Sequence, residues 1–219
     1  LGQINAMKRK FIFTIFGIDV LLILLHIFFG AQFDLFNLDR ERTPGAYWSG
    51  AQLIAVAAFA VGMVLLSSTR RRRLLWGIFG FLFMGFGFDE ISELHENITY
   101  YVSTYLHIPI PMFFRSTTYN WLIILSPLII FAFVFLIFFL KTLQQENMLS
   151  RKLLLGGVFF FMLAMGFEFV NGLDASQQFY NALVVLEESS ELFGESLVLL
   201  GMLRIASDHF DLQYQKRIQ

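Results

Sequence analysis

The stretch RRLLWGIFGFLFMGFGFDE at residues 72–90 contains a basic start, a long apolar run and an acidic end. A run of ~20 apolar residues is long enough to cross a bilayer as a helix. The stretch RKLLLGGVFFFMLAMGFEF at residues 151–169 has the same order, and a Gly-Phe-acid triplet lies at the same distance from its basic start. The match predicts an internal duplication, in which the third membrane span resembles the fifth, although a bias towards Phe, Leu and Gly accounts for part of it.

The composition of the whole chain is that of an integral membrane protein. Of its 219 residues, 57% are hydrophobic and only 15% are charged, and the mean hydropathy of +0.64 is far above that of a soluble domain. The chain has no cysteine, which excludes disulfides and thiolate metal sites. It also lacks a Walker loop and a dinucleotide-binding fingerprint. We therefore expect the lipid bilayer as a partner, no nucleic acid and no nucleotide cofactor.

We predict an all-α fold, a six-transmembrane helix bundle that forms a single domain over residues 1–219. The predicted spans are approximately 11–30, 47–66, 74–94, 120–140, 153–172 and 181–203. Basic residues cluster before the first span, between the second and third, between the fourth and fifth, and after the last. By the positive-inside rule both termini are expected in the cytoplasm. We expect a multi-pass protein of the bacterial inner membrane.

Nine carboxylates lie inside these spans or at their edges. A charged side chain at the centre of a spanning helix costs roughly 2.5–3.5 kcal/mol on insertion scales, so such residues usually face the interior of a bundle. No Lys or Arg lies in the same halves of these helices, so the acids must be protonated, hydrated or bound to a cation. The nine are Asp19, Asp89, Glu90, Glu93, Glu168, Glu187, Glu188, Glu191 and Glu195.

The heights of these acids predict a funnel that opens on the outer side of the membrane. Asp89 and Glu90 are expected about 6 to 8 Å below the outer end of the third span, because each helical residue rises ~1.5 Å. In the sixth span Glu191 is expected near the midplane and Glu195 about 21 Å below the outer end. No charge interrupts the cytoplasmic halves of the third and fifth spans. We therefore expect the cytoplasmic side to be sealed.

Carboxylates from three helices at similar depth, with a histidine beside them, form a ligand set that hard or borderline cations prefer. We expect a site for protons or for a divalent metal ion, whose identity is left open. The predicted metal-site residues are Asp89, Glu90, Glu93, His95, Glu168, Glu187, Glu188 and Glu191. Asp19, His26 and Glu195 are assigned to a proton or ion pathway. The pattern differs from a di-iron carboxylate bundle, because Ser92 stands where a Glu-x-x-His motif ending at His95 needs Glu.

Three classes of function fit these residues. The class we favour is proton or cation handling, including intramembrane metal-dependent chemistry, and whether the protein is an enzyme is left open. The second is an accessory transmembrane subunit of a larger complex, or a homo-oligomer, in which the acids meet groups on another chain. The third is a binder or carrier of a small cationic ligand.

Simpler roles compete for individual residues. Glu93 fits a hydrated helix end, and Glu188 and Glu191 fit protonated carboxyl groups that join two helices. A histidine at the position of His26 is more often a helix-packing donor than a ligand. Asp19 is expected to be either a protonatable switch or a contact with a partner subunit. The aromatic segment 97–118 is expected to lie in the membrane interface, where it covers the funnel.

Overall fold

The computed structural model describes residues 2–40, 42–105, 120–143, 147–173 and 177–218, which form helices and no strand. This confirms the all-α fold class. The elements are α1 (Gly2–Phe29), the 3₁₀ turn η1 (Asp34–Phe36), α2 (Pro44–Leu66), α3 (Arg70–Ser92), α4 (Leu94–Tyr105), α5 (Trp121–Ile124), α6 (Ser126–Thr142), α7 (Met148–Gly172) and α8 (Gln177–Ile218).

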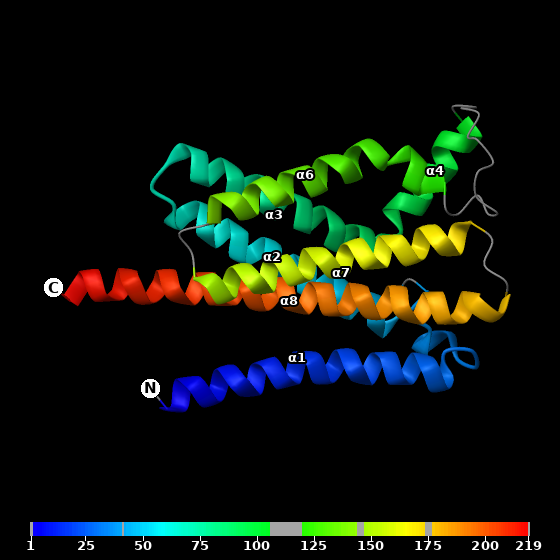
Figure 1. The fold of residues 1–219 in the computed structure, drawn as a ribbon, viewed down its shortest axis with the longest axis horizontal. Helices are drawn as coiled ribbons and strands as arrows, with labels where there is room; N and C mark the ends of the chain where they lie inside the picture. The colour runs from blue at the N-terminus through cyan, green and yellow to red at the C-terminus, as the bar shows by residue number, and fades with distance from the viewer. Residues whose placement is uncertain (1, 41, 106–119, 144–146, 174–176, 219) are drawn as a thin grey trace.

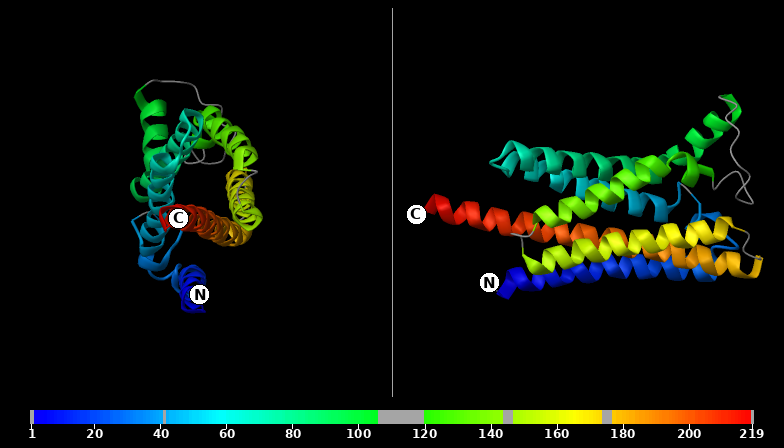
Figure 2. Two further views of the ribbon diagram at one scale, coloured as in Figure 1. Left: turned by 90° about the vertical axis from the view of Figure 1, so that its left-hand side faces the viewer. Right: turned by 45° about the horizontal axis from the view of Figure 1, so that its top comes forward.

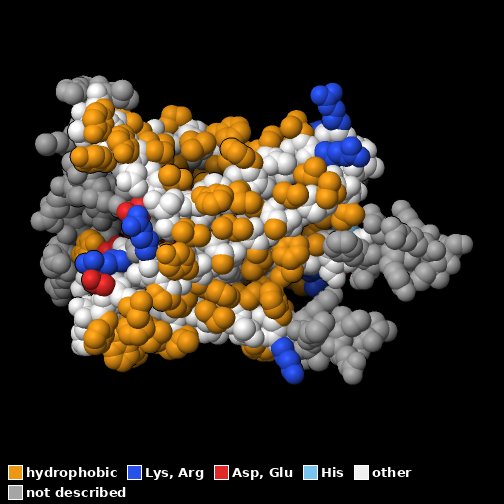
Figure 3. Space-filling view, turned by 180° about the vertical axis from the view of Figure 1, so that it is seen from behind, with side chains coloured by type: hydrophobic (Ala, Val, Ile, Leu, Met, Phe, Trp, Pro, Cys, Tyr) orange, Lys and Arg blue, Asp and Glu red, His pale blue; other side chains and the backbone are white. Residues whose placement is uncertain are grey.

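Among the described residues, four helices are long and apolar enough to cross a bilayer, namely α1 over Lys10–Phe29, α2, α3 and α7. Helix α6 is apolar but has only 17 residues. The 42-residue α8 carries the four acids of the predicted sixth span. Figure 3 shows a broad band of hydrophobic side chains between basic side chains at one end and mixed charges at the other. These features indicate a multi-pass membrane protein, whereas the count of six spans stays a prediction.

The two termini lie at the same end of the bundle, as Figures 1 and 2 show. We call it the basic end, because α3 begins there at Arg70 and α6 ends there with Lys141 in its last turn. We call the opposite end the strap end, because the connection between α1 and α2, which contains residues Asp34–Arg40, lies there. Placement of the basic end in the cytoplasm follows from the positive-inside rule and stays a prediction.

Small residues allow two antiparallel helix pairs to pack closely. In the α2–α3 pair, a Cβ atom added to Gly87 would lie 3.0 Å from the carbonyl oxygen of Gly50. In the α7–α8 pair, a Cβ atom added to Gly157 would lie 2.7 Å from the carbonyl oxygen of Gly194. Such backbone approach is typical of packing between membrane helices, where small side chains maximise van der Waals contact.

The glycines that correspond in the predicted duplication have different surroundings. Gly87 is pressed against α2, whereas its counterpart Gly166 has no atom within 4 Å of an added Cβ. Gly77 likewise faces open space, but its counterpart Gly156 approaches Leu197. The packing therefore gives no support to equivalent roles for these residues, and the duplication stays a prediction.

An aromatic core fills the space between α3 and α6 towards the basic end. The ring centroids of Phe79 and Phe139 lie 4.6 Å apart, and those of Trp76 and Phe139 lie 4.8 Å apart. Phe83 continues the cluster along α3, with its ring centroid 4.5 Å from that of Phe79. Trp76, Phe79, Phe83 and Phe139 are all buried. These rings form part of the buried core, and the sealed cytoplasmic side stays a prediction.

The predicted fourth span at 120–140 is interrupted, which corrects the sequence analysis. The helical path breaks at Leu125, where α5 ends and α6 begins. Pro127 explains the break, because proline has no N–H for the bond to residue 123 and its ring crowds that carbonyl group. Helix α4 contains the first part of the predicted interfacial segment and exposes Tyr100 and Tyr101. Residues 106–119 lie outside the described residues.

Helix α1 lies at the edge of the bundle, with α8 as its principal neighbour (Figures 1 and 2). From Lys10 to Phe29, only Ile15 and Asp19 are buried. Most of the remaining side chains in this range are apolar and at least partly exposed, as expected for contact with lipid. The attachment of α1 along its length therefore depends strongly on Asp19.

Candidate functional site

Asp19 joins three helices through hydrogen bonds. Its carboxyl group is fully buried, and its Oδ1 accepts hydrogen bonds from Trp48 Nε1 at 2.8 Å and from Gln52 Nε2 at 3.3 Å. Its Oδ2 lies 2.6 Å from Ser196 Oγ. Within the described residues no Lys or Arg forms an ion pair with Asp19. Asp19 thus faces α2 and α8 of its own chain, which does not support its predicted alternative role as a contact with a partner subunit.

Ser196 lies between two acceptors. Its Oγ is 2.6 Å from Asp19 Oδ2 and 2.9 Å from Gln52 Oε1, but a hydroxyl group has only one proton to donate. If Ser196 donates to Gln52, the contact with Asp19 is completed only when the aspartic acid carries a proton. This arrangement can therefore accommodate one proton at Asp19.

Glu195, the residue before Ser196 on α8, forms a second hydroxyl bridge. Its side chain is 2% exposed, and Ser49 Oγ donates to its Oε1 at 2.5 Å. Ser49 also forms a hydrogen bond with the carboxyl group of Glu90 on α3. The other oxygen of Glu195, Oε2, is buried and has no hydrogen-bond partner in the described part of the chain. One serine hydroxyl therefore connects two carboxyl groups from different helices.

Further acids lead from this bridge towards the strap end. Glu191, one turn before Glu195 on α8, lies within electrostatic range of Glu90, Glu187 and Glu188 as well as of Glu195. Glu90, Glu187, Glu188 and Glu191 are partly exposed, whereas Glu195 is buried. The acids on α8 therefore become less exposed along the helix, from Glu187 near the strap end to the buried Glu195 inside the bundle.

The height of Glu195 in the bundle depends on the helix from which it is counted. Its partner Ser49 is five residues after Pro44, the first residue of α2, which corresponds to a rise of about 7.5 Å from the strap end of that helix. The predicted depth of about 21 Å was counted along the sixth span from residue 181. Helix α8 begins at Gln177 and extends beyond its neighbours (Figure 1), so the two helices give different heights, and the depth of Glu195 in the membrane stays a prediction.

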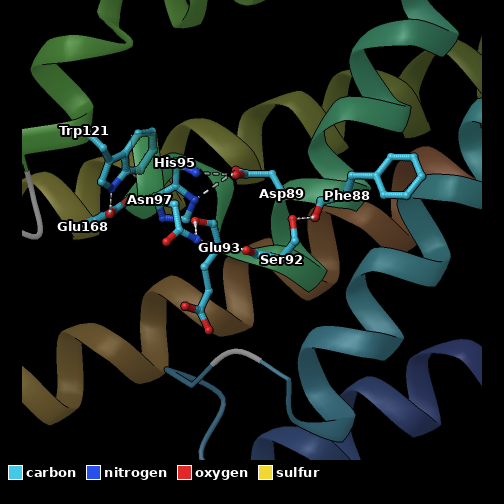
Figure 4. A network of polar contacts seen from close by, with 8 residues as sticks. All are labelled: Phe88, Asp89, Ser92, Glu93, His95, Asn97, Trp121 and Glu168. Atoms are coloured by element: carbon cyan, nitrogen blue, oxygen red, sulfur yellow. Dashed lines mark hydrogen bonds and ion pairs between the residues drawn. The ribbon is translucent and has the colours of Figure 1, made fainter. Parts of the chain in front are cut away.

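A separate polar network joins α3, α4, α5 and α7, as Figure 4 shows. Asp89 Oδ1 accepts from the backbone N–H of His95 at 2.8 Å, and Asp89 Oδ2 lies 3.0 Å from His95 Nδ1. The His95 ring packs against Trp121, with a centroid distance of 4.7 Å, and Trp121 Nε1 donates to Glu168 Oε1 at 2.7 Å. Asp89 therefore orients His95, while the indole connects the imidazole to Glu168.

Glu93 lies apart from both groups. It ends α3 in the left-handed conformation with φ 56°, and its side chain points away from Asp89 and Glu168 in Figure 4. Its Oε1 is 3.9 Å from Arg42 Nε. This position fits the simpler role of an acid at a helix end.

The eight predicted metal ligands consequently form several groups, although Glu90 is within electrostatic range of Asp89 and His95, and Glu187 is within range of Glu168. The groups are the Asp89–His95 pair, Glu168 at Trp121, Glu93 at Arg42, and the cluster of Glu90, Glu187, Glu188 and Glu191. Across the described ranges, no three His, Asp or Glu side chains are arranged to hold one metal ion. Metal binding stays a prediction, and the geometry gives more support to hydrogen-bonded carboxyl groups.

Residues 14–206 match a protein-family model with the description "Domain of unknown function (DUF8692)". The chain belongs to this family. The DUF8692 region contains both hydroxyl bridges and the Asp89–His95 pair. No curated protein and no solved structure matches the chain. The DUF8692 description names no activity.

The sequence analysis of this DUF8692 chain missed the neutral partners of the acids, which are Trp48, Ser49, Gln52, Ser196 and Trp121. A signal for two of them was present, because Ser49 and Gln52 are polar and three residues apart within an otherwise apolar span. His26, predicted to lie on the ion pathway, accepts a hydrogen bond from the backbone of Leu38 at the strap end.

Proposed function

We propose that this membrane protein handles protons, and that its central proton site is the Glu90–Ser49–Glu195 bridge. The observation that carries the proposal is the position of a single hydroxyl group between two carboxyl groups. Ser49 has one proton and donates it to Glu195, so the contact with Glu90 is a hydrogen bond only when Glu90 supplies a proton. The bridge is complete when the pair holds one acidic proton.

Electrostatics support the same protonation state. Two ionised carboxylates in an apolar bundle would repel each other, and each would lose its hydration energy. No Lys or Arg among the described residues forms an ion pair with Glu90 or Glu195. Removing one charge by protonation is the simplest compensation. The two carboxyl groups are then expected to titrate as a coupled pair, and Ser49 provides a route for exchange of the proton between them.

The surroundings of this bridge support access from the strap end. The partly exposed Glu187, Glu188 and Glu191 lead to it from the strap end. Towards the basic end lies the aromatic core around Phe79 and Phe139. One-sided access favours proton binding that changes the conformation of the protein over flow through an open pore. Asp19 would extend this conformational change to α1, because the Ser196 hydroxyl between Asp19 and Gln52 also accommodates a proton.

A divalent metal ion is the second candidate ligand. It is favoured by the buried and unpartnered Oε2 of Glu195, which lies within electrostatic range of Glu90. Metal binding would require side-chain movement, since the described acids and histidines do not form a set of three ligands. We therefore favour a proton over a metal ion as the ligand of this bridge.

Infrared difference spectroscopy of the protein in lipid bilayers tests the proton site. At a pH of about 7, where an ordinary glutamate is ionised, we expect a carbonyl stretching band from a protonated carboxyl group. Glu90→Gln should lack this band, because the amide of glutamine donates to Ser49 without an acidic proton. Glu93→Gln is the matched control, and it should retain the band because Glu93 lies away from the bridge.

Two results would oppose the proposal. If Glu90→Gln leaves every protonated-carboxyl band of the wild type unchanged, Glu90 does not hold the proton. Elemental analysis of the same samples covers the second candidate. Stoichiometric metal in the wild type that is lost in Glu90→Gln, but kept in Glu93→Gln, would make a metal ion the ligand.

A further inference from the structure

Side-chain and backbone contacts hold the connection between α1 and α2 in place at the strap end. We use the term strap for residues Asp34–Arg40, which include η1. Leu38 in the strap is buried and packs on Gly45, where an added Cβ would lie 2.3 Å from Leu38 Cδ2. The backbone N–H of Leu38 donates a hydrogen bond to His26 Nδ1 at 3.0 Å. Leu38 is therefore held by an apolar contact with α2 and by a hydrogen bond to α1.

The hydrogen bond from Leu38 determines the protonation state of His26. An N–H group donates, so Nδ1 must accept through its lone pair, and the imidazole must be neutral. The ring also forms a hydrogen bond with the backbone of Phe36 in the strap. If His26 gains a second proton, Nδ1 becomes a donor. Two donors then face each other, so the hydrogen bond between Leu38 and His26 is lost.

A second fastening connects the strap to α8. Tyr180 OH donates to Asp39 Oδ2 at 3.2 Å. Asp39 is within electrostatic range of His26, and it also interacts with Arg40 on the strap and Glu187 on α8. A protonated His26 would therefore find a carboxylate partner in Asp39. Desolvation beside α8 raises the pKa of Asp39, while the Tyr180 hydrogen bond and the charges of His26 and Arg40 oppose this shift.

We propose that the strap is a latch that neutral His26 keeps closed and that protonation of His26 releases. In the closed state Leu38 is bonded to His26 and Asp39 is bonded to Tyr180. In the released state the His26 cation pairs with Asp39, and Leu38 leaves its place on Gly45. Acidification at the strap end thus separates the strap from Tyr180 on α8, and an ion pair between Asp39 and His26 replaces the Leu38 hydrogen bond to α1. The latch depends only on these contacts and does not depend on the proton site at Ser49.

Distance measurements by double electron–electron resonance test the latch, since the chain has no native cysteine and labels attach only where cysteines are introduced. We choose Asp34→Cys on the strap and Arg204→Cys on α8 for the spin labels. Loss of the exposed Arg40–Asp34 pair should have little effect. Residue 204 lies 24 residues along α8 from Tyr180, which corresponds to about 36 Å and is suitable for the method.

The wild type with these labels should give a narrow distance distribution at a pH of about 8 and a broader, shifted distribution at a pH of about 5. These two pH values lie on either side of the ordinary pKa of histidine. His26→Asn should remain narrow at both pH values, because Oδ1 of asparagine can replace Nδ1 as an acceptor but does not titrate. His26→Leu should be broad at both. A second label pair at Val61→Cys and Arg204→Cys reports whether the bundle itself remains folded.

Three results would overturn the latch. The first is a wild-type distribution that does not change with pH while the Val61–Arg204 distance shows an intact bundle. The second is a pH response in His26→Asn equal to that of the wild type. The third is a response that disappears in Asp39→Asn but persists in His26→Asn, which would identify Asp39 as the titrating group.

Discussion

Gly157→Leu is expected to destabilise the protein by about 3 kcal/mol, at the upper end of the usual range for overpacking. A Cβ atom at this position would lie 2.4 Å from Val198 Cγ2 and 2.7 Å from the carbonyl oxygen of Gly194. The second contact involves backbone, which a side-chain rotation cannot relieve. The larger leucine must therefore force α7 and α8 apart, and the dispersion contacts between these helices are lost.

Gly166→Leu provides a matched control for this prediction. Both glycines lie in α7, but an added Cβ at Gly166 has no atom within 4 Å. Thermal unfolding in the same lipid or detergent should show a much lower midpoint for Gly157→Leu and a nearly unchanged midpoint for Gly166→Leu. Equal midpoints would show that α7 and α8 do not pack at Gly157 as described.

Asp19→Leu is expected to release α1 from the bundle. The substitution leaves the donors of Trp48 and Gln52 without their common acceptor and removes the contact between Asp19 and Ser196. Interhelical hydrogen bonds in membranes average about 0.6 kcal/mol and reach about 1.7 kcal/mol, so the loss of three predicts a destabilisation of about 2 kcal/mol. Asp19→Asn should cost less, because Oδ1 can still accept from Trp48 and Gln52 while Nδ2 donates to Ser196 Oγ.

Cysteine labelling can measure this release separately from global unfolding. Ile15→Cys would place a thiol on the buried face of α1, where Ile15 is 2% exposed. A membrane-permeant maleimide should react with it faster in the Asp19→Leu background than in the wild-type or Asp19→Asn background. Phe13→Cys, at a position that is 76% exposed, should react equally in all three. Unchanged labelling of Ile15→Cys in Asp19→Leu would contradict the role of Asp19 as the attachment of α1.

The helices themselves were largely predictable, because their formation depends on local properties of the chain. The apolar runs that begin near Lys10, Arg70 and Arg151 correspond to the membrane-length helices α1, α3 and α7. The break in the fourth span was also readable from Pro127, whose missing N–H is a local property. The acids were correctly identified as unusual, because their cost in an apolar helix depends only on residue type and position.

The partners of the acids were not predictable in the same way. Ser49 and Glu195 are 146 residues apart in the chain, and Asp19 and Ser196 are 177 residues apart. Their contacts depend on how each helix is rotated and how far it slides along its neighbours. The hydrophobic pattern does not determine these quantities in membrane helices, because lipid-facing and buried positions are equally apolar.

By itself, the sequence determined that this protein is helical, that several of its segments are apolar enough to cross a membrane, and that these segments carry acids without nearby cations, because the length and polarity of each segment are sufficient for these conclusions. Only the tertiary structure decided that Ser49 connects Glu90 to Glu195, that Asp19 attaches α1, and that Glu93 lies apart. A hydrogen bond requires two atoms within about 3 Å. The close approach of helices at glycines such as Gly157 and Gly87 sets those distances, and it is a property of the packed bundle.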